Sequence, residues 1–350
     1  MQLAVGPGAG MILVTGGAGF IGANFVHDWL AEHDEPIINL DKLAYAGSLA
    51  SLEGVLHDPR HIFVHGDVAD SELLARLLES HKPRAIVHFA AQSHVDRSIL
   101  NPEDFIQTNI VGTFRLLEAA RAYWMTQDAA AREQFRFLQI STDEVYGSLE
   151  PDDTPVDERH AYAPRNPYSA SKAAADHLVH SYRCTYGLPV LTTNCSNNYG
   201  RFQYPEKLIP RILLQALAGK PLPVYGDGLQ VRDWIHVQDH CSAVRQVLQL
   251  GVPGQSYNIG ANCERSNLSV IRDVCILLDQ LKPRVDGLSY SKQITHVTDR
   301  MGHDRRYGLD ASRLRNELSW KPLHSFEDGL AHTVRWYLAN PEWVKSLLEA

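Results

Sequence analysis

Two groups of residues in the middle of the chain have the side-chain types needed for proton transfer. Residues 135–140 form an apolar run that predicts a strand, and residues 141–144 (Ser, Thr, Asp and Glu) follow it directly. They would bring a hydroxyl and two carboxylates to the carboxyl edge of a sheet, where open α/β sheets carry out their chemistry. Tyr168 and Lys172 stand four positions apart after Pro167, a favoured first residue of a helix, and would share one helix face. An ammonium beside a phenol favours the phenolate, so this pair could act as a base.

Both groups also have an ordinary structural interpretation. A Tyr-x-x-x-Lys spacing is most often a surface pair on a helix, and a carboxylate pair after a strand is most often a solvated turn. The catalytic interpretation becomes the better one only if the same chain also binds a redox cofactor.

A dinucleotide site is indicated near the start of the fold. Residues 11–15 predict a buried strand, and Gly16, Gly19 and Gly22 follow it before a helical pattern begins. Such glycines allow a tight turn and a close approach of a pyrophosphate to the helix N-terminus, although this G-x-x-G-x-x-G spacing could also serve packing alone. Asp41 ends the next predicted strand, nineteen residues after Gly22. A carboxylate near this spacing binds the adenosine ribose and repels a 2′-phosphate, which favours NAD over NADP.

Further predicted strands lead to the same edge of the sheet. Residues 62–65 precede Asp67, which is placed to meet the adenine amino group, and residues 85–89 precede small residues that would let nicotinamide and its ribose lie against the backbone. Strands that alternate with helical patterns predict an α/β fold with a doubly wound parallel sheet of the Rossmann type. The looser pattern beyond Asn194 predicts a smaller, interleaved C-terminal lobe that binds the substrate.

This pattern gives an expected domain organisation. We expect a flexible N-terminal extension at residues 1–10, an NAD-binding domain at residues 11–193 and a mainly substrate-binding lobe at residues 194–350. Later strands from about residues 230–262 are expected to return to the sheet, so no single cut point separates the two parts.

Composition excludes several other classes of protein. The net charge of −8, without a basic block, argues against nucleic acid and anionic membrane surfaces, and no apolar run is long enough to span a bilayer. The five cysteines form no Cys-x-x-Cys pair, and their odd number fits reduced thiols in the cytoplasm. The seventeen histidines do not form a metal-binding frame, and we predict no metal site.

Longer motifs show a resemblance to a known family. Thr-Gly-Gly-Ala-Gly-Phe-Ile-Gly at residues 15–22, together with Asp41 and Tyr168-x-x-x-Lys172, resembles the extended short-chain dehydrogenase/reductase superfamily. Within it, the chain is similar to the dTDP-glucose 4,6-dehydratases from about residue 11 to residue 344. The motifs of this narrower resemblance lie at residues 41–47, 93–98, 141–147, 194–200, 205–210, 232–234 and 302–307.

The resemblance implies an internal redox cycle on a nucleotide-linked glucose. In this cycle NAD takes hydride from C4 while Tyr168 removes the O4 proton, and the resulting 4-keto group acidifies C5. Glu144 would take the C5 proton and Asp143 would protonate the departing C6 hydroxyl, after which hydride returns to C6 and NAD is regenerated. Thr142 would hydrogen-bond the O4 region, and Lys172 would bind the nicotinamide ribose and help to ionise Tyr168. The expected product is dTDP-4-keto-6-deoxy-glucose.

The resemblance also implies which residues hold each ligand. Those expected to bind the cofactor are Gly16, Gly19, Phe20, Ile21, Gly22, Asp41, Lys42, Leu43, Ala44, Asp67, Val68, Phe89, Ala90, Ala91, Ser93, Thr108, Tyr168, Lys172 and Asn198. Those expected to bind the sugar nucleotide are Ser93, Thr142, Asn197, Lys207, Leu208, Pro223, Val224, Tyr225, Arg232, Asn267, Asp299 and His303. Arg232 suits a diphosphate because its planar guanidinium pairs with phosphate oxygens at two points; a salt bridge to Asp233 or Asp239 is the alternative.

Other functions remain open at this point. A dehydratase of a UDP- or GDP-linked sugar would use the same chemistry, and an NAD-dependent 4-epimerase or decarboxylase would use Tyr168 and Lys172 but has no need of the carboxylate pair. A non-catalytic nucleotide-sugar-binding protein has no need of any of these groups. Gln92, Arg201 and a short loop at residues 148–163 depart from the family pattern, which bears on the nucleotide preference.

The resemblance carries two further expectations about the protein in the cell. It implies a homodimer that pairs a long helix near residues 105–124 with the Tyr168 helix of the partner. It also implies a cytoplasmic enzyme of deoxysugar biosynthesis, with dTDP-rhamnose as one possible end product.

Overall fold

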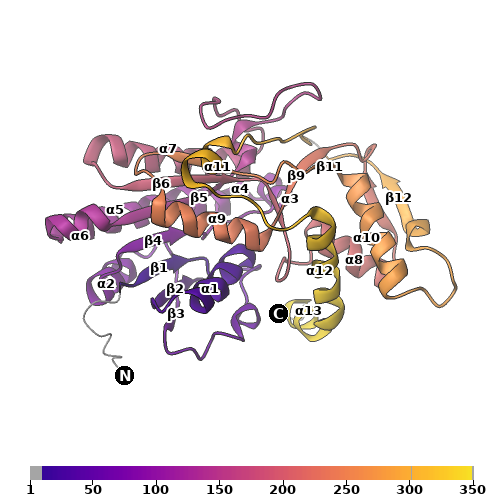
Figure 1. Ribbon diagram of the computed structural model, residues 1–350, viewed down its shortest axis with the longest axis horizontal. Coiled ribbons are helices and arrows are strands. Elements are labelled where there is room, and N and C mark those ends of the chain that lie inside the picture. Colours follow the sequence, from indigo (N-terminus) through magenta and orange to yellow (C-terminus); the bar gives the residue numbers. More distant parts are fainter. Residues whose placement is uncertain (1–9, 301, 349–350) are drawn as a thin grey trace.

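Seven parallel strands form the main sheet of the computed structural model, which describes residues 10–300 and 302–348. The predicted extension at residues 1–10 lies outside the described residues, except for Gly10. The spatial order is β10-β6-β5-β4-β1-β2-β3 (Figure 1). The strands are β1 (Ile12–Thr15), β2 (Ile37–Asp41), β3 (His61–His65), β4 (Ala85–His88), β5 (Arg136–Thr142), β6 (Val190–Cys195) and β10 (Ser256–Ile259). The order reverses between β1 and β4, which confirms the predicted doubly wound sheet and marks where such folds bind ligands.

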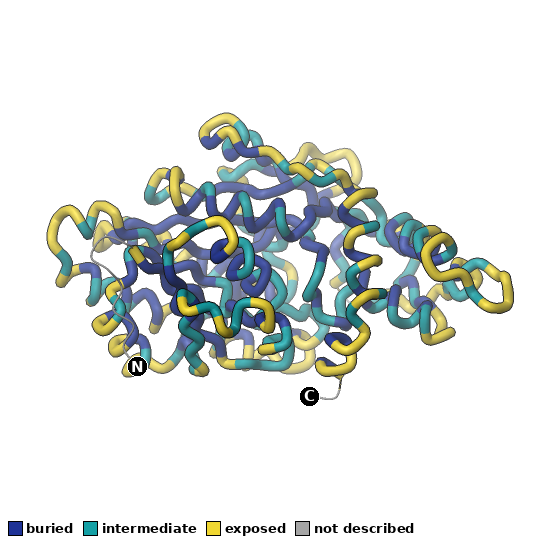
Figure 2. Tube along the Cα trace, turned by 60° about the horizontal axis from the view of Figure 1, so that its bottom comes forward, coloured by how far each residue is buried: buried dark blue, intermediate teal, exposed yellow. Residues whose placement is uncertain are grey.

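Helices cover both faces of this sheet because its strands are apolar on both sides. Ile12 and Val14 pack towards one group of helices, whereas Leu13, between them, packs towards the other. The first group is α1 (Phe20–Glu32), α9 (Val237–Leu250) and α11 (Ser312–Leu318). The second is α2 (Ser71–His81), α5 (Thr113–Thr126) and α7 (Pro167–Tyr186). Figure 2 shows the buried residues concentrated in this part of the molecule.

A smaller lobe with its own apolar core lies at the right-hand end of Figure 1. Its helices are α8 (Leu208–Leu217), α10 (Asn267–Leu281), α12 (Phe326–Ala339) and α13 (Pro341–Leu348). Its strands are β7 (Asn197–Tyr199), β8 (Leu222–Tyr225), β9 (Val231–His236), β11 (Glu264–Ser266) and β12 (Ile294–Val297). Because α9, β10 and α11 return to the main sheet between these segments, the two parts interleave. Of the later strands expected to return from about residues 230–262, only β10 does so; β9 pairs with β7 and β11 in the small lobe instead.

Short helical segments complete the described chain. They are η1 (Leu49–Leu52), α3 (Val95–Leu100), α4 (Pro102–Phe105), η2 (Ile106–Gly112), α6 (Ala129–Gln134), η3 (Asp143–Tyr146) and η4 (Tyr290–Gln293). The continuous helix expected at residues 105–124 is instead a π-helical segment, η2, followed by α5. Across residues 10–300 and 302–348, no helix has the length and apolarity needed to cross a membrane.

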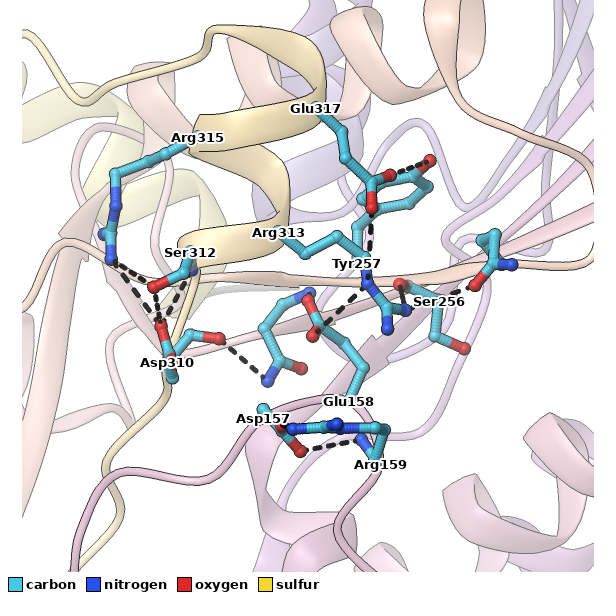
Figure 3. Close-up of polar contacts among 12 residues, drawn as sticks. Asp157, Glu158, Arg159, Ser256, Tyr257, Asp310, Ser312, Arg313, Arg315 and Glu317 are labelled. Atoms are coloured by element: carbon cyan, nitrogen blue, oxygen red, sulfur yellow. Dashed lines mark hydrogen bonds and ion pairs between the residues drawn. The ribbon is translucent and has the colours of Figure 1, made fainter.

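The open edge of the main sheet at β10 is sealed by two charged side chains (Figure 3). The Asn258 N–H donates to Glu158 Oε1 (2.8 Å), and Arg313 Nη1 donates to the Ser256 carbonyl (2.9 Å). Arg313 Nε lies 3.7 Å from Glu158 Oε2, so the two caps also neutralise each other. An edge strand whose backbone groups are occupied in this way cannot pair with another chain.

We expect Glu158→Ala to lower the free energy of unfolding by about 1–3 kcal/mol, because the Asn258 N–H and the Arg313 guanidinium would both lose a buried acceptor. Urea unfolding followed by circular dichroism measures this change. Glu317→Ala is the matched control, since Glu317 also lies near Arg313 (3.8 Å) but its side chain is 49% exposed, against 3% for Glu158. We expect the control to change stability by less than about 0.5 kcal/mol. Equal losses in the two variants would contradict this account of the edge.

Candidate active site

A continuous cleft runs along the carboxyl ends of the central strands and is closed on one side by the small lobe. Many of the predicted site residues line it: Gly16, Gly19, Phe20, Ile21, Gly22, Asp41, Lys42, Ala44, Asp67, Val68, Phe89, Ala90, Ala91, Ser93, Thr108, Thr142, Asp143, Glu144, Tyr168, Lys172, Asn197, Asn198 and Lys207. Other predicted residues are not part of this lining: Leu43, Leu208, Pro223, Val224, Tyr225, Arg232, Asn267, Asp299 and His303.

The cleft also contains residues that were not predicted as ligand contacts. They are Leu40, Tyr45, Ala46, Gly47, Gly66, Gln92, Ile140, Ser141, Cys195, Ser196, Gln203, Tyr204 and Glu206. Several, such as Tyr45, Ser141 and Glu206, belong to the motifs that carry the family resemblance, so a signal was present. Gln203 and Tyr204 lie outside those motifs, and no pattern in the sequence marks them.

The glycine turn between β1 and α1 leaves room only for backbone. A Cβ on Gly16, whose φ is +74°, would lie 2.5 Å from the Ala90 nitrogen, and a Cβ on Gly22 would lie 2.2 Å from the Gly16 carbonyl oxygen. No described side chain caps the N-terminus of α1 at Gly19. The first N–H groups of the helix therefore remain available to an anion, and the turn fits the pyrophosphate of NAD.

Asp41 fixes this turn to the end of β2. Its Oδ2 accepts a hydrogen bond from the Ala18 N–H (2.8 Å) and its Oδ1 accepts one from the Leu43 N–H (2.7 Å). Each oxygen keeps a free lone pair, which suits a ribose hydroxyl. Beside it, Lys42 Nζ and Asp67 Oδ2 form an ion pair at 2.7 Å, so the residue predicted to meet adenine contacts another residue predicted to bind the cofactor.

The two carboxylates after β5 sit in different surroundings. Asp143 is almost fully buried; its Oδ1 accepts from Thr142 Oγ1 (3.2 Å), and its Oδ2 has no hydrogen-bond partner among the described residues. Burial, and then the neighbouring Glu144, raise the pKa of Asp143 well above its usual range. Burial also raises the pKa of Glu144, but Arg232 and a hydrogen bond from Asn166 Nδ2 (3.4 Å) oppose the shift. Asp143 is therefore the better acid and Glu144 the better base.

Helix α7 carries Tyr168 and Lys172 to this strand end. Its N-terminus has a capping box between Asn166 and Ser169, and it ends, as predicted, at a left-handed Gly187. Lys172 Nζ donates to the Ile140 carbonyl of β5 (2.7 Å), which joins the helix to the strand.

The surroundings of Tyr168 favour its neutral form over the phenolate. Burial, followed by the charge of Glu144, raises the pKa of Tyr168 well above 10, and a hydrogen bond with Thr142 opposes the shift. The helical spacing correctly predicted that the phenol and Lys172 share a face, but it could not show how strongly burial disfavours the phenolate.

The π-helical segment η2 ties the small-residue loop after β4 to α7. Asn109 Oδ1 accepts from the Gln92 N–H (2.8 Å), and Asn109 Nδ2 donates to the Gln92 carbonyl (3.0 Å) and to Ser171 Oγ (2.8 Å). A π-helical turn holds one more residue than an α-helical turn, and such turns are frequent at functional sites. Here it turns Asn109 towards the loop that borders the cleft.

Arg232 is held by backbone carbonyls and an aromatic ring rather than by a neighbouring aspartate. Its Nη2 donates to the Asp304 carbonyl (3.0 Å), its guanidinium lies over the Tyr307 ring, and its charge acts on Asp143 and Glu144. Within the described chain it forms no ion pair with the aspartates that the sequence offered as alternatives. A cation is thus available near the carboxylates.

The small lobe supplies a second group of predicted residues. Asp299 Oδ1 lies 2.6 Å from His303 Nδ1, and the His303 ring meets the Tyr225 ring edge-on with centroids 6.5 Å apart. Lys207 crosses to the other side of the cleft, where its Nζ donates to the Ser93 carbonyl (2.8 Å). No group of three or more His, Cys, Asp or Glu residues in the described ranges could hold a metal ion.

We expect Gly19→Ala to keep its folded stability but to lose NAD affinity by roughly tenfold or more, equivalent to about 1.4 kcal/mol. An added Cβ meets only the Gly16 carbonyl oxygen, at 3.4 Å, yet Gly19 lines the cleft at the helix N-terminus. Gly22→Ala is the comparison, because its Cβ would displace the turn and should lower both stability and affinity. Thermal unfolding and calorimetric NAD titration measure the two quantities. Gly19→Ala with the parent affinity would contradict the placement of the pyrophosphate.

Comparison with known proteins gives a consistent result. The family described as GDP-mannose 4,6 dehydratase matches residues 13–333. A dTDP-glucose 4,6-dehydratase of Xanthomonas campestris pv. campestris (strain B100) is 56% identical over 337 residues, covering 96% of this chain and 95% of the relative. The dTDP-glucose 4,6-dehydratase 1 of Escherichia coli (strain K12) is 51% identical over 344 residues, covering 96% and 95%.

Solved structures extend the comparison to the fold. The dTDP-glucose 4,6-dehydratase of Bacillus anthracis in complex with NAD has a TM-score of 0.85 and 45% identity, covering 97% of this chain and 100% of that one. DesIV, a dTDP-glucose 4,6-dehydratase of Streptomyces venezuelae with NAD and TYD bound, has a TM-score of 0.87 and 45% identity, covering 96% and 99%. The UDP-glucose 4-epimerase of Thermotoga maritima has a TM-score of 0.83 but only 26% identity, covering 94% and 99%. The chain belongs to the dTDP-glucose 4,6-dehydratase family within the extended short-chain dehydrogenases/reductases.

Proposed function

We propose that this protein converts dTDP-glucose into dTDP-4-keto-6-deoxy-glucose and water, with NAD as a regenerated cofactor. The observation that carries this proposal is the adjacent pair of buried Asp143 and half-buried Glu144, with unequal surroundings, in the same cleft as Tyr168 and Lys172. Relatives of 51–56% identity with this activity in their names support the choice of substrate.

The first half of the reaction needs a base at the C4 hydroxyl. NAD, when bound, supplies the hydride acceptor for C4 and later the hydride donor for C6. Tyr168 removes the O4 proton, with Thr142 hydrogen-bonded beside it. Lys172 contributes its own ammonium to the environment of the phenol, and its hydrogen bond to the Ile140 carbonyl keeps the side chain in position. Oxidation leaves a ketone at C4, which makes the C5 proton acidic.

The second half needs a base and an acid on neighbouring carbons. Glu144 takes the C5 proton, and Asp143 gives its proton to the C6 hydroxyl, which leaves as water. Burial keeps Asp143 protonated until this step, whereas Arg232 and Asn166 favour the ionised form of Glu144. Two adjacent carboxyl groups can therefore perform opposite tasks.

The same pair separates this proposal from an epimerase. An epimerase of the family shares the fold at a TM-score of 0.83, so the fold alone does not distinguish the two reactions. A 4-epimerase returns the hydride to C4 and has no step for a second base and an acid. A 4,6-dehydratase of a UDP- or GDP-linked sugar is the alternative that keeps every catalytic role.

We assign the nucleotide end of the substrate to the small lobe. Arg232 would pair with the diphosphate, since within the described residues its guanidinium forms no ion pair with Asp233 and its charge acts on Asp143 and Glu144. Tyr225, Asp299 and His303 form a hydrogen-bonded and aromatic group that could receive the pyrimidine. Asn197, Leu208, Pro223, Val224 and Asn267 would complete this end.

The decisive experiment is to incubate the purified protein with dTDP-glucose, without added reductant, and to follow the products by mass spectrometry. Loss of one water with formation of a 4-keto-6-deoxy sugar is the expected result. Water loss only from a UDP- or GDP-linked sugar would overturn the nucleotide. A C4 epimer without water loss would overturn the reaction.

We expect Glu144→Gln and Asp143→Asn to slow turnover by at least about a hundredfold, because general acid and base catalysis each contribute roughly 10²–10⁴. Both variants should keep NAD bound, since neither residue belongs to the glycine turn. Rapid-quench measurement of C5 proton exchange with solvent separates their roles: exchange should vanish in Glu144→Gln and persist in Asp143→Asn. Full activity of the Glu144→Gln variant would contradict the assignment of Glu144 as the C5 base.

We further propose a cytoplasmic homodimer that serves deoxysugar biosynthesis, for example of dTDP-rhamnose. The stretch from α3 to α5 presents apolar side chains to solvent, with Leu100 85%, Ile106 48% and Phe114 37% exposed. Large apolar side chains exposed in one stretch of chain are what an interface with a second copy would cover. Light scattering should therefore give twice the chain mass, and Ile106→Glu should give a monomer. A stable monomer of the parent protein would contradict the dimer.

A further inference from the structure

A buried aspartate lies behind the catalytic pair on α7. Asp176 follows Lys172 by four residues, so the two side chains share one helix face, but Asp176 is not part of the cleft lining. Its side chain is almost fully buried. Burying an ionised carboxylate in such a place costs desolvation free energy unless the group is hydrogen-bonded and balanced by a cation.

The carboxylate is well supplied with hydrogen bonds from neutral groups. Its Oδ2 accepts from Ser141 Oγ (2.5 Å) and from the Tyr162 hydroxyl (3.3 Å), and its Oδ1 accepts from Gln139 Nε2 (3.4 Å). Burial raises the pKa of Asp176, and the Lys172 ammonium together with these three donors opposes that shift. Ser141 and Gln139 both belong to β5, so Asp176 is fixed to the strand that ends in the catalytic carboxylates.

The buried ammonium of Lys172 requires a nearby negative charge, just as the buried carboxylate of Asp176 requires a positive one. The ammonium is buried and donates to the Ile140 carbonyl, a neutral acceptor. Burial lowers the pKa of Lys172, and Asp176 is the leading charge that opposes this shift. Asp176, one helical turn away on the same face of α7, therefore favours the protonated form of this amine.

We propose that Asp176 is a positioning residue that keeps Lys172 in its ammonium form and thereby makes Tyr168 a usable base. It touches neither substrate nor cofactor and acts through Lys172. This inference rests on the proposed function, because Tyr168 acts as a base only if the chain oxidises a sugar hydroxyl.

The other titratable groups around this pair stay neutral near physiological pH. Burial lowers the pKa of His88 on β4 to about 3 and raises that of Cys195 on β6 to about 12. It also raises the pKa values of Tyr146 and Tyr162, which face Asp176 from the segment after β5. Asp176 is thus the group whose charge can set the state of Lys172.

The test is the pH dependence of kcat in Asp176→Asn, a variant of the same shape without the charge. If Asp176 acts through Lys172, loss of the carboxylate disfavours the ammonium, and the pKa of Tyr168 rises. Tyr168 must be deprotonated to act as a base. The acidic limb of the plot of kcat against pH should therefore shift to higher pH by about one pH unit or more. At pH values below the shifted pKa, kcat should fall by about tenfold per pH unit. The KM for the sugar nucleotide should stay unchanged.

A readout without turnover comes from ultraviolet titration of tyrosinate. The absorbance of each protein, minus that of its Tyr168→Phe counterpart, follows Tyr168 alone. This curve should move to higher pH in Asp176→Asn. A move to lower pH would mean that Asp176 acts on Tyr168 directly as a negative charge, and an unchanged curve would mean that it does not act on the pair. Either outcome overturns the inference.

Two further variants complete the test. Asp239→Asn removes a different buried, hydrogen-bonded carboxylate, on α9, and should leave the limb in place. Ser141→Ala removes the shortest hydrogen bond to Asp176 and should move the limb in the same direction by a smaller amount; it decides the matter if Asp176→Asn does not fold. A parent enzyme without dehydratase activity would overturn the proposed function instead, which keeps the two failures apart.

Discussion

The partial shielding of the end of β5 from water is the constraint on which this structure depends. Asp143 and Glu144 follow a strand that lies between β4 and β6; the Asp143 side chain is buried, and Glu144 is half-buried at the cleft. Burial alone would raise the pKa of both carboxyl groups, so that both would serve as acids and neither as a base. Arg232 acts on both carboxyl groups, so the difference comes from their other neighbours: Asn166 donates a hydrogen bond to Glu144, whereas Asp143 meets the charge of Glu144 and keeps one oxygen without a described partner. The surrounding fold holds these few contacts in place.

Both parts of the chain are needed to build that environment. The main sheet supplies the glycine turn, the carboxylates and α7, and the small lobe supplies Arg232 and Lys207. The lobe is anchored across the cleft by the bond from Lys207 to the Ser93 carbonyl and by an ion pair between Arg300 and Asp96 (3.3 Å). Because the chain passes between the parts more than once, the lobe is not an appended module. Its core and the main core form as one interleaved structure, which keeps the cation close to the carboxylates.

The sequence predicted the strands, the glycine turn and the positions of Tyr168 and Lys172 well, because each follows from local periodicity and from where parallel strands end. It could not predict the π-helical segment at Asn109, since the apolar pattern of a π turn resembles that of an α turn. Asp176 was also invisible, because an aspartate on a helix looks the same in sequence whether it faces solvent or a buried lysine. The high pKa of Tyr168 likewise depends on how many distant segments cover it. Long-range burial, which no local spacing encodes, accounts for most of what was missed.

The seal on β10 has a consequence for synthesis of the protein. The strand takes one cap from Glu158, which precedes it, and the other from Arg313, which follows it in the chain. On the ribosome, the edge of the sheet therefore stays partly open after β10 has formed, until α11 has left the exit tunnel. During that interval Glu158 can already accept the Asn258 N–H, but the Ser256 carbonyl still lacks the Arg313 guanidinium. Capping of this edge is complete only once α11 is in place.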